Sequence, residues 1–162
     1  MTGTRNDAGP ASLAAAVAEL AQKSGRRIAT AESLTGGRIS CLLGAAPNSS
    51  SWYRGSIVAY ATEVKHALLQ VPPGPVVSPR SARQMATSTA DLLGADTVIA
   101  VTGAAGPASQ DGHDPGTVWF GLYDRGTVST EKKAFLGEPP DVVEQTAEHA
   151  LELLARCIGA RQ

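Results

Sequence analysis

The stretch ESLTGG begins at Glu32 and combines an acid, two hydroxyls and two glycines where an apolar run ends. Ser33 is a potential nucleophile. Backbone N–H groups beside Gly36 and Gly37 can bind an anion or an oxyanion, because a helix start leaves such donors unbonded. Taken alone, Ser33 or Thr35 is more simply a helix cap. Glu32 is compatible with capping, with orienting a lysine and with hydrogen-bonding a ribose.

Two further stretches, YATEVK and TGAAGP, follow other apolar runs and supply chemical partners for Ser33. Tyr60 ends one run, and Lys65 follows on the first turns of a helical pattern. A lysine that is partly desolvated in a crevice has a lowered pKa, so Lys65 can accept the hydroxyl proton of Ser33. TGAAGP begins at Thr102 and lacks the glycine patterns of common nucleotide-binding loops. Together these residues predict hydrolysis of an amide in an anionic small molecule.

Alternating helix and strand patterns must position these residues. The strand patterns cover residues 27–31, 55–61, 96–103, 117–124 and 127–135. The second of these, GSIVAYA, indicates a buried strand, whereas the more polar last one is typical of a sheet edge. The dipeptide RG between the last two predicts a β-hairpin.

Helical patterns fill the segments between these strands. Gly25 ends the first helix, and Ser78 with Pro79 supplies an N-cap and first position for another. The last helix carries an apolar stripe that includes Val143 and Leu151. The chain is therefore predicted to be an α/β protein, a three-layer α/β/α sandwich with a mixed, mostly parallel sheet and one β-hairpin. Because ligands bind at the carboxyl ends of strands in such sheets, the three polar stretches are expected to converge on one crevice.

Length and composition restrict the class of protein. The 162 residues suit one domain, with residues 1–9 as a disordered tail and residues 10–160 as the domain. A net charge of −1 and only 4% aromatic residues argue against a nucleic-acid partner. No apolar run is long enough to span a membrane, and Cys41 and Cys157 are expected to be buried free thiols, so a cytoplasmic location is expected. The polar sequence DGHD, from Asp111 to Asp114, indicates a surface loop, and neither a metal nor a cofactor is expected.

The motifs AESLTGG, YATEVK, VTGAAGP and GTVWFGL, in this order, resemble the C-terminal domain of the competence/damage-inducible protein CinA over about residues 11–158. That family includes nicotinamide-nucleotide amidases. The resemblance implies an amidohydrolase that converts nicotinamide mononucleotide to nicotinate mononucleotide and ammonia in pyridine-nucleotide recycling. It implies Ser33 as nucleophile and Lys65 as base, supported by Tyr60 and Thr102. The substrate-binding residues that it implies are Glu32, Thr35, Gly36, Gly37, Gly103, Gly106 and Thr117.

Two positions depart from the family pattern. Ala61 and Thr62 replace a usual Ser-Asn pair, and residues 142–145 of the final helix lack the arginine that relatives commonly hold there. Such an arginine suits a phosphate, so a non-catalytic or altered-specificity nucleotide-binding module is the alternative function. A homo-oligomer, dimer or higher, is compatible with either.

Overall fold

The structure is a computed structural model that describes residues 9–160, so the expected tail lies outside the described residues except for Gly9, which precedes the first helix. The elements are α1 (Pro10–Ser24), β1 (Ile28–Glu32), α2 (Arg38–Gly44), α3 (Ser49–Trp52), β2 (Tyr53–Val58), α4 (Thr62–Leu69), α5 (Pro79–Leu93), β3 (Thr97–Gly103), β4 (Thr117–Asp124), β5 (Thr127–Ala134) and α6 (Pro139–Gly159). None of the helices within residues 9–160 has the length and apolar character that a membrane span needs.

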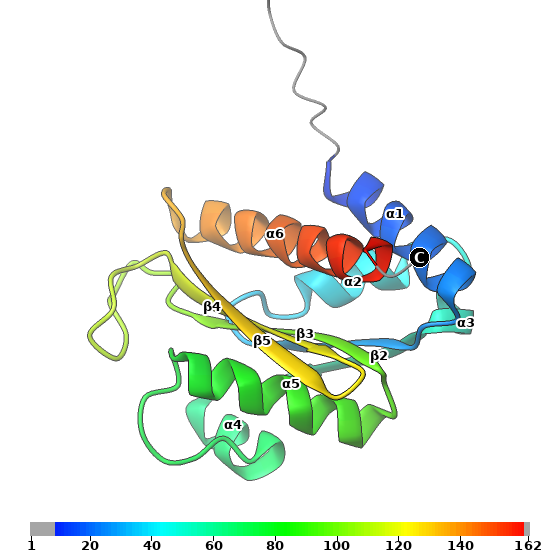
Figure 1. Ribbon diagram of the computed structural model, residues 1–162. Helices are drawn as coiled ribbons and strands as arrows, with labels where there is room; N and C mark the ends of the chain where they lie inside the picture. Colours follow the sequence, from blue (N-terminus) through cyan, green and yellow to red (C-terminus); the bar gives the residue numbers. More distant parts are fainter. Residues whose placement is uncertain (1–8, 161–162) are drawn as a thin grey trace, which may run out of the picture.

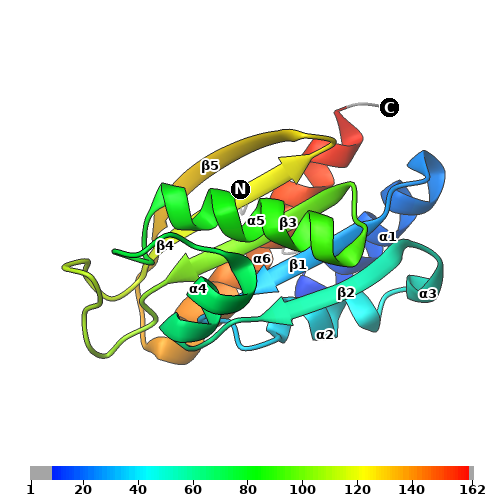
Figure 2. The same ribbon diagram turned by 90° about the horizontal axis from the view of Figure 1, so that it is seen from below.

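The five strands form one mixed sheet in the order β2-β1-β3-β4-β5 (Figure 2). Strand β1 is parallel to both β2 and β3, whereas β4 is antiparallel to β3 and to β5. Because β5 reverses direction again, β4 is the strand that runs against the other four described strands. The β4–β5 hairpin turns at Arg125 and Gly126, both with positive φ, as the RG dipeptide predicts.

Helices cover both faces of this sheet, with α1, α2 and α6 on one side and α4 and α5 on the other (Figure 1). All seven residues of β3 are buried, because both of its faces are covered. Successive side chains alternate between the layers: Ile99 belongs to the core beneath α1 and α6, while Val98 and Ala100 belong to the core beneath α5. The predicted three-layer α/β/α sandwich is confirmed.

Several local predictions can be compared with the described residues. Ser78 caps α5 by accepting a hydrogen bond from the Ser81 amide at 3.1 Å, and Gly25 ends α1 in the left-handed conformation, both as predicted. The polar strand β5 is an edge strand, also as predicted.

Other predictions about burial are wrong. Strand β2 is the opposite edge of the sheet, so its residues are only partly buried and Val58 is 44% exposed. On α6, Val142 rather than Val143 faces the core. Neither Cys41 nor Cys157 forms a disulfide, but Cys41 is exposed and Cys157 is only partly buried, because neither lies on the inward face of its helix.

Candidate active site

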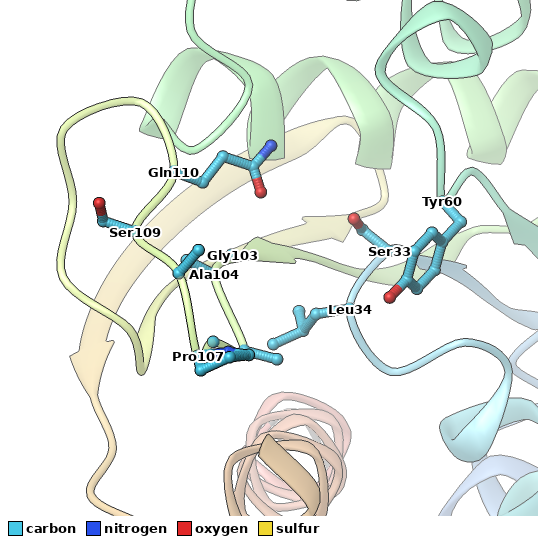
Figure 3. A pocket seen from close by; sticks show the side chains of 11 residues that line it. Ser33, Leu34, Tyr60, Gly103, Ala104, Pro107, Ser109 and Gln110 are labelled. Atoms are coloured by element: carbon cyan, nitrogen blue, oxygen red, sulfur yellow. The ribbon is translucent and has the colours of Figure 1, made fainter. Parts of the chain in front are cut away.

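A pocket of about 330 Å³ lies where the ends of three parallel strands meet. Its lining combines Ser33 and Leu34 after β1, Tyr60 after β2, and residues 103–110 at the end of β3, here called the pocket loop. Figure 3 shows Ser33 and Tyr60 on one side of the pocket and the loop on the other. The structure thus brings parts of all three polar stretches together at the carboxyl edge of the sheet.

Ser33 is the first residue after β1 and is 5% exposed. Within residues 9–160, its hydroxyl makes no hydrogen bond to another group, whereas its carbonyl accepts the Gly36 amide at 3.0 Å and closes the turn. An unbonded hydroxyl at the surface of a pocket is available to a ligand. An accessible hydroxyl is one requirement for a serine nucleophile, and a base that can reach it is the other.

Lys65 lies on α4 with only 2% of its surface exposed. Its Nζ donates a hydrogen bond to the Tyr60 carbonyl at 3.3 Å. Burial lowers the pKa of the Lys65 amine below its ordinary value, and the charge of Asp111 raises it by a smaller amount. Lys65 is not among the residues that line the pocket, and no hydrogen bond joins it to Ser33 within the described chain. Such a bond often forms only when a substrate is bound.

The Glu32 carboxylate is fully buried and fixes the turn that carries Ser33. It accepts hydrogen bonds from two amides in the first turn of α2 and from three hydroxyls, on β1, on β2 and in the turn before α2. Its donors are Thr35 Oγ1 (2.8 Å), Ile39 N (2.9 Å), Ser40 N (2.9 Å), Ser56 Oγ (3.1 Å) and Thr30 Oγ1 (3.4 Å). A carboxylate at a helix N-terminus satisfies unbonded N–H groups and stabilises the helix dipole. Of the roles open to Glu32 from sequence, these contacts favour capping, and they also engage Thr35.

The four predicted glycines divide into two pairs. Gly36 and Gly37 have φ values of 57° and 105° and form the turn into α2, but neither lines the pocket. Gly103 and Gly106 do line it. A Cβ at Gly103 would lie 2.6 Å from the Thr117 carbonyl, so only glycine permits this close approach of β3 and β4.

The two predicted threonines are buried behind the pocket. The Thr102 hydroxyl donates to the Val76 carbonyl at 2.7 Å, and Thr117 contributes backbone hydrogen bonds at the base of the pocket loop. Neither side chain lines the pocket. Their positions suit residues that hold the loop rather than residues that contact a ligand.

Sequence reasoning missed Leu34, Ser109 and Gln110 in the lining, and it assigned Asp111 only to a surface loop. The Asp111 carboxylate in fact accepts two backbone hydrogen bonds, from Val76 and Val77. No local pattern gives these contacts, which join residues far apart in the chain. No charged side chain lines the pocket, and no group of three or more potential metal ligands occurs within the described residues.

A salt bridge joins Arg38 of α2 to Glu144 of α6, within the stretch 142–145 where the resemblance implied an arginine. Arg38 Nε is 2.7 Å from Glu144 Oε1, and its Nη2 is 3.3 Å from Oε2. Both side chains are a little under half exposed. The hydrogen bond to Glu144 raises the pKa of Arg38, so the guanidinium keeps its charge. Arg38 is thus engaged by a carboxylate of α6.

Comparison with known proteins identifies the same family as the motifs. The CinA C-terminal domain matches residues 10–158. A CinA-like protein from Mycobacterium tuberculosis is 40% identical over 154 residues, and one from Dictyoglomus thermophilum is 36% identical over 154 residues. These matches cover 90% and 91% of this chain but only 36% and 38% of the relatives. The chain therefore spans little more than a third of their length.

Solved structures match this chain over nearly the whole length of both proteins. The competence damage-inducible protein A (ComA) from Klebsiella pneumoniae superposes with a TM-score of 0.91 at 34% identity, covering 95% of this chain and 99% of that protein. A CinA superfamily protein from Escherichia coli superposes with a TM-score of 0.89 at 30% identity, covering 95% of this chain and 94% of that protein.

Proposed function

The chain belongs to the CinA C-terminal domain family, and from this membership and the geometry of the pocket we propose that it is an amidohydrolase. Its proposed substrate is nicotinamide mononucleotide, which it converts to nicotinate mononucleotide and ammonia. Ser33 is the proposed nucleophile and Lys65 the proposed base. The product would return to pyridine-nucleotide synthesis.

The observation that carries this proposal is the unbonded Ser33 hydroxyl facing a loop with free backbone donors. Between residues 105 and 109, the loop amides donate no hydrogen bond within the described chain. Backbone N–H groups that point into a cleft can hold an anion or an oxyanion without the cost of reorganisation. A nucleophile opposite such donors supports acyl transfer.

The proposed reaction has two halves. Ser33 Oγ attacks the carboxamide carbon while its proton passes to the neutral Lys65 amine. The C–N bond then breaks, ammonia leaves with the proton that Lys65 returns, and an ester remains on Ser33. Water attacks this ester with Lys65 as base, and the C–Oγ bond breaks, so that nicotinate mononucleotide leaves and Ser33 recovers its proton. Lys65 must leave the Tyr60 carbonyl and turn toward Ser33 when substrate is bound.

One observation favours a second candidate, a nucleotide-binding module without turnover. The amine of Lys65 is engaged by Tyr60, and Arg38 is engaged by Glu144. If these contacts persist with ligand present, the pocket binds a nucleotide but does not activate Ser33. A rise in melting temperature with nicotinamide mononucleotide, without ammonia release, would identify this function.

The test is ammonia release from nicotinamide mononucleotide by the purified chain and by Ser33→Ala. We expect the variant to lose activity by several orders of magnitude, as is usual when a covalent nucleophile is removed. Ser129→Ala is the matched control, because it removes an exposed hydroxyl on β5. Turnover by Ser33→Ala at a tenth of the parent rate would refute the nucleophile assignment.

A further inference from the structure

The pocket loop has few hydrogen bonds of its own to give it shape. Its base is closed by Ala104, whose amide donates to the Thr117 carbonyl at 3.0 Å. At its far end, the last loop residue Gln110 exchanges two backbone hydrogen bonds with His113. The N–H groups of Ala105, Gly106, Ala108 and Ser109 make none within the described chain, and Pro107 has no N–H to donate. A loop of this kind keeps one conformation only if other parts of the protein hold it, because ordering a backbone has an entropic cost at every residue.

Both ends of the loop are attached to the same dipeptide, Val76-Val77, in the segment before α5. At the start, the Thr102 hydroxyl donates to the Val76 carbonyl at 2.7 Å. Just past the other end, Asp111 Oδ2 accepts hydrogen bonds from the Val76 amide at 2.9 Å and the Val77 amide at 3.0 Å. Val76 and Val77 are 2% and 1% exposed.

These contacts are of the strong kind. A carboxylate that accepts from backbone amides forms charge-assisted hydrogen bonds, roughly twice as strong as neutral ones. The amides also need a partner, since a buried N–H without an acceptor is destabilising. Asp111 reaches them from a left-handed conformation, with φ 53°, which aspartate adopts more readily than most residues. The DGHD sequence therefore contains one side chain with a defined partner, not only a solvated surface loop.

The same segment is attached to the helix that carries Lys65. The Val71 amide donates to the Lys65 carbonyl at 3.1 Å, and the Val71 carbonyl lies 2.7 Å from His66 Nδ1. Residues 71–77 thus lie between α4 on one side and the pocket loop on the other. Any group that fixes the loop to Val76 also fixes it relative to Lys65.

We propose that Asp111 is a positioning residue that, with Thr102, clamps the pocket loop onto Val76 and Val77 and so fixes the pocket wall opposite Ser33. Its effect on turnover rests on the proposed amidase function, but the clamp itself does not. Asp111 acts through the loop and does not touch the substrate.

The clamp is tested first by amide hydrogen exchange at Val76 and Val77, measured by NMR on the full chain. In Asp111→Ala, we expect the protection of both amides to fall about ten-fold or more. Both hydrogen bonds reach one oxygen, so Asp111→Asn retains an acceptor. We expect the protection of the two amides to fall only about three-fold in this variant. Asp114→Asn, which removes a charge from the same loop, should leave both amides as in the parent. A larger loss in Asp111→Asn, up to that of the alanine variant, would still support the clamp and make the charge essential to it.

The second measurement is ammonia release by the same variants. Displacement of a substrate-contacting wall by about 1 Å can reduce kcat/KM by up to a hundred-fold. We expect kcat/KM to fall ten- to hundred-fold in Asp111→Ala. Most of this activity should return in Asp111→Asn, and Asp114→Asn should keep the parent value.

Unchanged exchange at Val76 and Val77 in Asp111→Ala would overturn the proposal. So would altered exchange together with full activity, because the clamp would then not position the wall. If the parent chain releases no ammonia, the amidase proposal fails, and the exchange measurement still decides whether the clamp exists.

Discussion

At the scale of single residues, Lys65 combines a cationic group with near-complete burial. Burial lowers the pKa of its amine below the ordinary value of 10.5. Because the neutral amine is the proposed base, kcat/KM is expected to rise with pH through this lowered pKa. Lys65→Arg should be inactive at every accessible pH, since arginine keeps the charge and cannot act as a base. A flat profile from pH 6 to 9, or an active arginine variant, would contradict the role of Lys65 as base.

The same burial predicts that Lys65 destabilises the fold. Between the lowered pKa and 10.5, the unfolded chain binds more protons at Lys65 than the folded chain, so stability rises with pH across this window. Below the lowered pKa, Lys65 is charged in both the folded and the unfolded chain, so folding carries the full cost of burying that charge. Lys65→Met, which removes the charge and keeps the apolar chain, should therefore be inactive but harder to unfold with urea at pH 7, and this advantage should shrink as pH approaches 10. A methionine variant less stable than the parent at pH 7 would show that the hydrogen bond to Tyr60 outweighs the burial penalty.

Glu32 illustrates what a residue's neighbours in sequence do not reveal. Its position at a strand-to-helix junction leaves capping, lysine orientation and ribose binding open. The structure resolves this because the carboxylate meets donors from β1, α2 and β2, including the Ser56 hydroxyl at 3.1 Å. These groups become neighbours only when the sheet has formed. Burial then requires that the carboxylate be fully hydrogen-bonded.

At the scale of elements, we expect the contact between α2 and α6 to affect the binding of the proposed phosphate-bearing substrate. Arg38 is held by Glu144 in a forked arrangement, and no charged side chain of the described residues lines the pocket. A phosphate that approaches Arg38 must compete with this carboxylate. Glu144→Gln removes the competing charge, so we expect KM for nicotinamide mononucleotide to fall about three- to ten-fold, with kcat little changed. The figure is modest because the pair is partly exposed and screened.

The comparison substrate for this prediction is the phosphate-free riboside. Its KM should change by less than about two-fold in Glu144→Gln, because it offers nothing for Arg38 to bind. Glu148→Gln removes a carboxylate one turn further along α6 and serves as the control. Equal falls for both substrates would show that Glu144 acts on the pocket's shape rather than on phosphate. No change for either would mean that Arg38 does not reach the substrate.

Element borders were predictable where the signal is local. Ser78 next to Pro79 marks the start of α5, and the Arg125-Gly126 turn marks the hairpin, because caps and tight turns depend on adjacent residues. The sequence does not predict the short helix α3, and it predicts a buried strand for β2, which lies at an edge of the sheet. Whether an apolar strand lies in the centre or at the edge of a sheet depends on strand order, and neither residue composition nor periodicity fixes that order.

At the scale of the whole molecule, the site's location was predictable for a topological reason. Parallel strands place their carboxyl ends on one edge, so residues after β1, β2 and β3 meet although they are far apart in sequence. The partners of Asp111 and Arg38 were not predictable, because their contacts span 35 and 106 positions of the chain. The sheet determines which strand ends meet, and the loops and helices around it determine which side chains touch.

A buried ion pair lies at the ends of the strands away from the pocket. It joins Asp124, at the end of β4, to Arg26, which lies just before β1. Arg26 is 2% exposed and Asp124, the last residue of β4, is 8% exposed. Arg26 Nη1 donates to the Asp124 carboxylate and to Thr97 Oγ1 at 2.9 Å. The Arg26 Nε has no hydrogen-bond partner within the described residues. Because both side chains are buried, the loss of one member leaves the other charge without its partner.

The last prediction concerns the stability of the whole fold. Asp124→Asn leaves the Arg26 charge buried without a counter-ion, which typically costs about 3–5 kcal/mol of unfolding free energy. Replacing both members, Arg26→Met with Asp124→Leu, removes the charge along with its partner and should cost clearly less, since apolar side chains of similar volume often substitute for a buried pair. Urea unfolding of the parent, the single variant and the double variant measures both differences, with Glu19→Gln as a control at an exposed pair with Lys23. A double variant no more stable than Asp124→Asn would show that Thr97 and the other contacts of Asp124, rather than the uncompensated charge, account for the loss.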